Sequence, residues 1–128
     1  MIKILSIALG GALGALARYF VSGRTHDLIP GLFVWGTLAV NGLGSFFAGV
    51  FFGLLDRFIV PANIRLFVLI GLLGAFTTFS TYTLETFNLL RDGELKLAFI
   101  NIILNNLIGL LLVIAGFMLS KLIMVFIR

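Results

Sequence analysis

Four long stretches without a charged residue divide this sequence and constrain its fold more than any other feature. A helix needs about 20 mainly apolar residues to cross the hydrocarbon core of a bilayer. Three stretches meet this length outright, and the first meets it when the Arg18 side chain extends to the membrane surface. We therefore predict an all-α integral membrane protein with a single domain over residues 1–128. Its transmembrane helices are expected at about residues 4–23, 28–55, 64–87 and 97–124.

The composition excludes the other fold classes. Of the 128 residues, 61% are hydrophobic and 11% are charged, whereas soluble domains carry about 25% charged residues. The chain has no cysteine, which excludes disulfides and thiolate metal sites, and the single histidine argues against a zinc site or a catalytic triad. The nine basic residues are scattered singly, a pattern that favours lipid head groups at the membrane edges and not nucleic acid.

The distribution of these basic residues predicts an unusual topology. With four spans, one membrane side carries five of them and the other carries four. The two sets are Lys3, Arg57, Arg65, Lys121 and Arg128, against Arg18, Arg24, Arg91 and Lys96. Because orientation follows the Lys/Arg excess, a near-tie predicts insertion in both directions and an antiparallel dimer with a two-fold axis in the membrane plane. The alternative is that a determinant other than charge fixes a single topology.

Polar side chains recur within the predicted spans. Thr37, Asn41 and Ser45 are four residues apart, so they form one stripe on a helix. The Asn41 amide offers two N–H donors that could serve an anion, and interhelical hydrogen bonding is the alternative role. Asn101 and Asn105 form a similar pair that is expected to line a pore or a dimer interface, while Asn106 points elsewhere. The many glycines are interpreted as close helix contacts.

The third span carries the densest run of weak helix formers, from Gly74 through Thr77 to Thr83. We predict a helix break there, near the bilayer midplane. Free backbone carbonyls at that depth must line a cavity or bind something, and in an antiparallel dimer they would suit a monovalent cation. Phe79 and Tyr82 are three residues apart, so their electropositive ring edges are candidates for a weak anion site.

Three segments together, residues 11–19, 36–45 and 74–85, resemble the Fluc/CrcB family of small fluoride channels, and the resemblance covers essentially the whole chain. It implies a channel and not an enzyme, located in the cell's inner (plasma) membrane, that exports cytoplasmic fluoride passively. It also implies a dual-topology antiparallel homodimer in the lipid bilayer, with two fluoride pores and a central structural sodium ion.

The resemblance assigns roles to individual residues. Asn41 resembles the pore asparagine that donates its amide to fluoride, and Phe79 resembles the first member of the family's phenylalanine box. Tyr82 stands at the second box position, where phenylalanine is usual, and adds a hydroxyl. Arg18 matches the arginine at the vestibule.

Further roles follow from the same resemblance. The carbonyls of Gly74 and Thr77 are expected to hold the sodium ion. Asn101 and Asn105 stand in the pore lining where the family often has tyrosine and serine. The polar track along the third helix corresponds to Ser80, Thr81 and Glu85.

Two other functions are alternatives to a fluoride channel. A small multidrug-type dual-topology exporter needs an acidic residue deep in its first helix, but residues 4–17 contain none and Glu85 lies at the end of the third span. A non-transporting assembly subunit would explain the glycines, but it leaves the polar stripes without a purpose.

Overall fold

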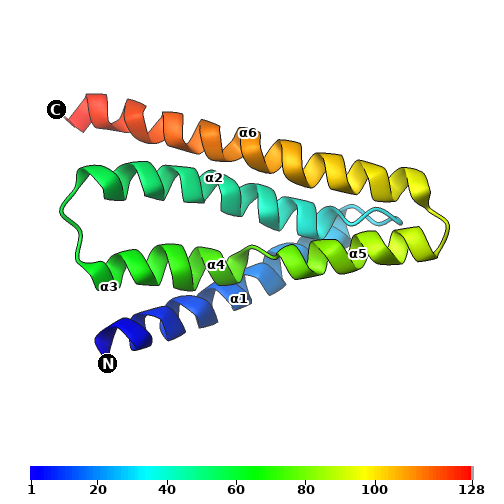
Figure 1. Ribbon diagram of the computed structural model, residues 1–128, viewed down its shortest axis with the longest axis horizontal. Coiled ribbons are helices and arrows are strands. Elements are labelled where there is room, and N and C mark those ends of the chain that lie inside the picture. Colours follow the sequence, from blue (N-terminus) through cyan, green and yellow to red (C-terminus); the bar gives the residue numbers. More distant parts are fainter. Residues whose placement is uncertain (128) are drawn as a thin grey trace.

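The computed structural model describes residues 1–127, and their regular structure is all helical (Figure 1). Four long antiparallel helical segments are apolar enough to cross a membrane, as predicted. The third segment is a series of shorter helices. The elements are α1 (Ile2–Leu28), α2 (Trp35–Arg57), α3 (Ala62–Arg65), the π-helix η1 (Leu66–Leu73), α4 (Gly74–Phe76), α5 (Phe79–Arg91) and α6 (Leu95–Ile127).

The ends of the segments gather at two opposite ends of the bundle. Figure 1 shows the N-terminus, the α2–α3 connector and the end of α6 at one end, with the α1–α2 and α5–α6 connectors at the other. It is the four-span topology that underlies the division of the basic residues into two sets. Of those residues, Arg128 lies outside the described part of the chain.

The first connector begins later than the sequence pattern placed it, because α1 continues to Leu28 and α2 begins only at Trp35. The polar residues 24–27 stay helical, since none of them is glycine or proline. The helix stops where Pro30 disfavours the helical conformation of Ile29, whose φ is −130° and ψ is 77°. With 27 residues, α1 is about 40 Å long and exceeds the hydrocarbon thickness.

The third segment breaks where the sequence predicted. Thr77 and Thr78 are extended, with ψ of 157° and 111°, between α4 and α5 (Figure 1). Thr78 also caps α5, because its hydroxyl oxygen accepts a hydrogen bond from the Thr81 backbone N–H at 3.1 Å. The break therefore ends one helix and starts the next without a long connector.

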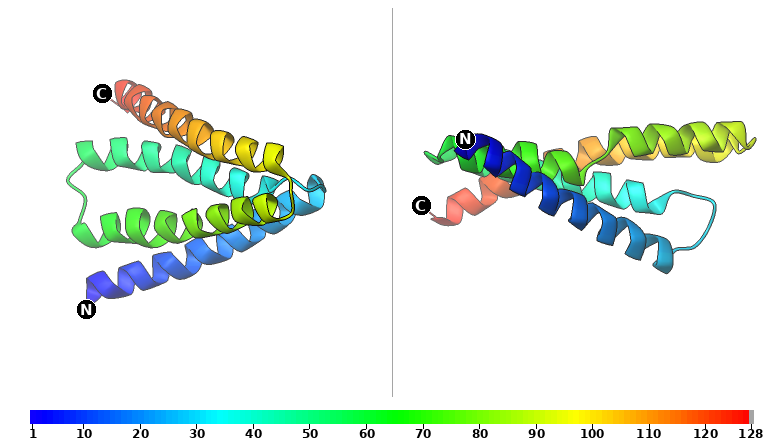
Figure 2. Two further views of the ribbon diagram at one scale, coloured as in Figure 1. Left: turned by 45° about the vertical axis from the view of Figure 1, so that its right-hand side comes forward. Right: turned by 90° about the horizontal axis from the view of Figure 1, so that it is seen from below.

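Glycines bring the helices close together. In Figure 2, α2 lies along α6, while α1 crosses beneath η1 and α4. Gly49 of α2 lies on the backbone of Val113, and Gly116 of α6 lies on the backbone of Phe46, so neither position has room for a Cβ. Glycines at the contact of α1 with η1 are Gly10, Gly14 and Gly71. These contacts fit the packing of membrane helices through small residues.

Burial in this bundle is the reverse of that in a water-soluble protein. Large apolar side chains cover the outside, and Leu16 and Phe126 are 56% and 83% exposed. Polar side chains lie inside, with Thr37 at 3% and Asn101 at 0% exposure. The outer surface therefore suits lipid, and the polar groups available for function lie between the helices.

Candidate functional site

The centre of the site is the point where the break in the third segment meets Asn41 of α2. The Asn41 side-chain Nδ2 donates to the Thr78 carbonyl at 3.2 Å, and the Thr78 N–H donates to Asn41 Oδ1 at 2.8 Å. One side-chain amide thus satisfies both backbone groups of Thr78. The paired bonds attach the extended residues to α2 and fix the shape of the break.

The same bonds release two backbone carbonyls. In a continuous helix, the Thr78 N–H would bind the Gly74 carbonyl, and the Thr81 N–H would bind the Thr77 carbonyl. Here the first N–H donates to Asn41 and the second to the Thr78 hydroxyl. The carbonyls of Gly74 and Thr77 consequently lose their helical partners.

A chain of hydrogen bonds leads from Asn41 across α6 to α5. Asn41 Nδ2 also donates to Asn105 Oδ1 at 3.0 Å, and Asn105 Nδ2 donates to Asn101 Oδ1 at 2.8 Å. Asn101 Nδ2 then donates to Thr86 Oγ1 at 2.9 Å, and the Thr86 hydroxyl donates to the Tyr82 carbonyl at 2.8 Å. We call these four bonds the amide chain. Every donor in it points the same way, and both Asn41 N–H donors are bound within the protein.

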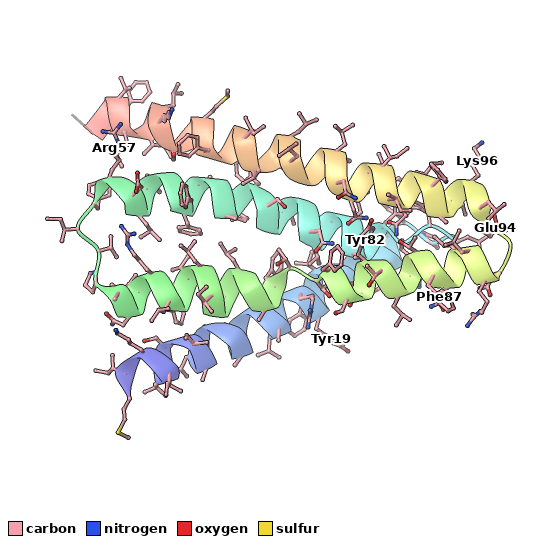
Figure 3. All side chains as sticks on the ribbon, viewed as in Figure 1. Tyr19, Arg57, Tyr82, Phe87, Glu94 and Lys96 are labelled. Carbon is pink, nitrogen blue, oxygen red and sulfur yellow. The ribbon has the colours of Figure 1, made fainter. Side chains whose placement is uncertain are left out.

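Polar and aromatic side chains surround a first cavity of about 410 Å³ beside the break. The Phe79 and Tyr82 rings lie 5.4 Å apart at 60°, with Phe79 75% exposed and Tyr82 buried. Figure 3 shows Tyr82 directed into the bundle, whereas Phe87 on the same helix is directed outward. The predicted site residues that line this cavity are Asn41, Gly74, Thr77, Phe79, Tyr82 and Asn105.

Asn106 also lines the first cavity, although its position on the helix led us to expect that it points elsewhere. Its Nδ2 donates to the Tyr82 hydroxyl at 3.2 Å and to the Ile102 carbonyl at 2.7 Å. The spacing along α6 does separate Asn106 from the line of Asn101 and Asn105. However, α5 places the long Tyr82 side chain within its reach, which no spacing on α6 could indicate.

A second cavity of about 790 Å³ lies where α1 and the α1–α2 connector meet α5. Arg18, Thr81 and Glu85 line it, together with Thr37 of α2. The Thr37 hydroxyl donates to Glu85 Oε1 at 2.8 Å, while the buried Oε2 has no hydrogen-bond partner among the described residues. Arg18 forms no ion pair with Glu85 within residues 1–127. Thr78 lines both cavities, so the break separates them.

Two predicted site residues line neither cavity. Asn101 is completely buried within the amide chain. Ser80 is exposed in the first turn of α5, where its Oγ lies 3.3 Å from the Thr78 hydroxyl. Thr78 and Thr86, which hold the break and one end of the amide chain, were not among the predicted site residues. The only indication of them in the sequence is that both belong to the hydroxyl-rich third span.

Comparison with known proteins places this architecture in a known group. A family model described as CrcB-like protein, Camphor Resistance (CrcB), matches residues 5–117. A fluoride-specific ion channel FluC of Magnetococcus marinus is 45% identical over 122 residues, which are 94% of this chain and 99% of that protein. The FluC proteins of Nitrosococcus oceani and Pyrococcus abyssi are 46% and 45% identical, over 94% and 91% of this chain and 98% and 94% of their own lengths.

Proposed function

Because the chain belongs to the CrcB family, whose relatives named above are fluoride-specific channels and not enzymes, we propose that it is a fluoride-selective channel through which cytoplasmic fluoride leaves the cell passively. The observation that carries the proposal is identity of about 45% along nearly the whole of both chains. The two polar cavities that meet at Thr78 supply a route for the ion.

In this proposal the second cavity is the vestibule. Arg18 raises the local concentration of anions there, and hydroxyl donors follow along α5. The polar track consists of Ser80, Thr81 and Glu85. The two hydroxyl groups of this track suit fluoride, because a small, strongly hydrated anion needs close donors to replace its water.

The ion then passes the break and enters the first cavity. Asn41 supplies an amide donor, and Phe79 and Tyr82 supply electropositive ring edges in a narrow wall that excludes larger halides. Asn105 completes the polar side of this wall, and Asn101 lies behind it, hydrogen-bonded to Asn105. None of these groups carries a full positive charge, so binding stays weak enough for release.

We propose that the working unit is an antiparallel homodimer with two pores. The first cavity carries amide and hydroxyl groups, and Asn106 is exposed on its wall. Such groups are costly against hydrocarbon, so a second copy of the chain is the cover that they favour. The near-equal basic charge at the two ends of the bundle supports insertion of the two copies in opposite orientations.

The carbonyls released at the break fit a structural sodium ion at the dimer centre. Hard monovalent cations prefer neutral oxygen donors, and the Gly74 and Thr77 carbonyls lack their helical partners. We propose that these two residues from each copy hold the ion. When bound, it supplies a fixed positive charge that favours anions nearby.

The proposal is tested by ion efflux from liposomes that contain the purified protein. We expect rapid fluoride efflux and chloride efflux no faster than from empty liposomes. Phe79→Ala should slow fluoride efflux about tenfold, because the exposed ring contributes little to folding and its edge is lost from the cavity. Phe87→Ala, on the outward face of the same helix, is the matched control and should leave the rate unchanged. Equally slow leakage of both anions would refute the channel.

A further inference from the structure

We propose that Asn101 is a positioning residue, which fixes the orientation of the Asn105 amide, and so the atom that Asn105 presents to Asn41, and does not contact the ion. This inference replaces the pore-lining role that the sequence predicted for Asn101. The effect of Asn101 on transport rests on the proposed fluoride channel, whereas its effect on the orientation of the amide does not. Three observations carry it, and they concern burial, the direction of the hydrogen bonds and the groups at the two ends of the amide chain.

The first observation is the position of Asn101. Its exposure is 0%, and it lines neither cavity, so an ion that moves through the two cavities does not reach its amide. A buried amide must nevertheless be hydrogen-bonded, and Asn101 is bonded on both sides, to Asn105 and to Thr86. Both bonds, at 2.8 and 2.9 Å, have the length of good hydrogen bonds, so the amide is satisfied on both sides within the protein.

The second observation is the direction of the bonds at Asn105. Asn105 Nδ2 donates to Asn101 Oδ1 at 2.8 Å and to the Asn101 carbonyl at 3.1 Å. Both bonds hold the nitrogen toward Asn101, so the Asn105 oxygen faces Asn41. Rotation of the Asn105 amide by half a turn would break these bonds and place two NH₂ groups opposite each other. Asn101 therefore sets which face Asn105 presents to Asn41.

The third observation is that backbone groups terminate the amide chain at both ends. At one end the Thr86 hydroxyl donates to the Tyr82 carbonyl, which can only accept. At the other end the N–H and the carbonyl of Thr78 fix which atom of the Asn41 amide is oxygen and which is nitrogen. Because neither end can reverse, the direction of the whole amide chain is determined by the backbone of the break and of α5.

This arrangement has a consequence for ion binding. The second Asn41 N–H is occupied by Asn105 Oδ1, so a fluoride ion must displace that oxygen to reach the donor. Without Asn101, the Asn105 amide is free to rotate, its oxygen leaves, and its own N–H groups can also donate to the ion. Binding would become tighter and release slower. Asn101 thus keeps the site weak, as conduction requires.

The test is the dependence of efflux on fluoride concentration for Asn101→Leu, which keeps the side-chain volume without the amide. We expect the half-saturating fluoride concentration to fall about fivefold, the effect of about one net hydrogen bond, and the maximal efflux to fall as well. Thr86→Val, which removes the hydroxyl at the far end of the amide chain but keeps both bonds from Asn105 to Asn101, should change both quantities in the same direction but less. Ser120→Ala is the matched control, because Ser120 is a buried polar residue of α6 that lies outside the amide chain and lines neither cavity, and its half-saturating concentration should not fall. Lower maximal efflux with unchanged half-saturation, which general damage produces, would overturn the proposal.

A second measurement separates this inference from the proposed function. In the solubilised protein without fluoride, the side-chain amide ¹H–¹⁵N signals of Asn41 and Asn105 should both move in Asn101→Leu, and the Asn41 signals should stay in place in Ser120→Ala. If Asn101→Leu does not fold, Thr86→Val provides the same comparison. Unmoved Asn41 signals would refute the positioning role. If the wild-type protein passed no fluoride, the proposed channel would be refuted, and the amide signals would still test the positioning role of Asn101.

Discussion

Tyr82 combines an aromatic ring and a hydroxyl group in one wall of the first cavity, and the structure gives them separate contacts. The ring is 8% exposed and lies 5.4 Å from the Phe79 ring. The hydroxyl oxygen accepts a bond from Asn106, so its own proton remains available to the cavity. Acceptance of one bond polarises a hydroxyl and strengthens it as a donor.

We predict that the ring of Tyr82 matters more for transport than its hydroxyl. Tyr82→Phe keeps the ring edge and should lower fluoride efflux by no more than about threefold, while the free energy of unfolding falls by about 1 kcal/mol as the Asn106 bond is lost. Tyr82→Leu removes the ring and should lower efflux more than about tenfold. Liposome efflux and thermal unfolding of the same preparations provide the two readouts. If Tyr82→Phe lost as much efflux as Tyr82→Leu, the hydroxyl would be the essential group.

At the residue scale, spacing within one helix could be predicted and partners across helices could not. The three-residue step from Phe79 to Tyr82 brings their rings together, as expected. The donors of Asn41 illustrate the limit, because the sequence left an anion and an interhelical partner both open, and the donors are bonded to Thr78 and Asn105. Those partners depend on the crossing of α2 with α6 and on the shape of the break, neither of which is encoded in a spacing.

At the element scale, the break in the third segment was predictable because its residues disfavour a helix locally. The π-helix η1 was not predictable, because its eight residues are uniformly apolar and no polar residue among them marks the period of the helix. The late end of α1 was missed for a related reason. Polar residues 24–27 read as a connector, although only Pro30 obliges the backbone to leave the helix.

The contact of α2 with α6 yields a prediction about packing. A Cβ at Gly49 would press on the Val113 carbonyl and the Phe117 N–H, which are backbone groups of a regular helix and cannot move aside singly. Gly49→Ala should therefore lower the free energy of unfolding by about 1–3 kcal/mol through overpacking. Gly11→Ala is the matched control, since nothing lies within 4 Å of its Cβ position. It should be neutral or stabilising by up to about 1 kcal/mol. Equal losses in thermal unfolding of the two variants would contradict this account.

At the scale of the whole molecule, the shortage of charge and the exposed apolar surface belong together. The sides of the bundle are covered by side chains such as Leu28 and Phe126, at 79% and 83% exposure, and this apolar cover favours neither direction of insertion. By the positive-inside rule the basic residues at the two ends set the orientation, and they are five against four. A protein with such a balance is sensitive to one or two added lysines.

This sensitivity leads to a prediction about assembly. Ile59→Lys with Ala62→Lys adds two basic residues at the α2–α3 end, where both positions are exposed. Asp92→Lys with Leu95→Lys adds two at the opposite end. This second variant also carries Lys3→Gln, which removes one basic residue from the α2–α3 end. Each variant should insert in one orientation only, because Lys/Arg excess marks the cytoplasmic side. Accessibility of a C-terminal tag on the two membrane faces measures this.

Transport by the same two variants then tests the antiparallel dimer. Expressed alone, each should fail to export fluoride, because its copies all face one way and cannot cover one another's first cavity in the antiparallel sense. Expressed together, they should restore export, since each supplies the orientation that the other lacks. Glutamine at the positions that receive lysine is the control for the substitutions themselves and should leave export as in the wild type. Full export by either lysine variant alone would mean that a single orientation suffices and that the polar wall of the first cavity is covered in some other way.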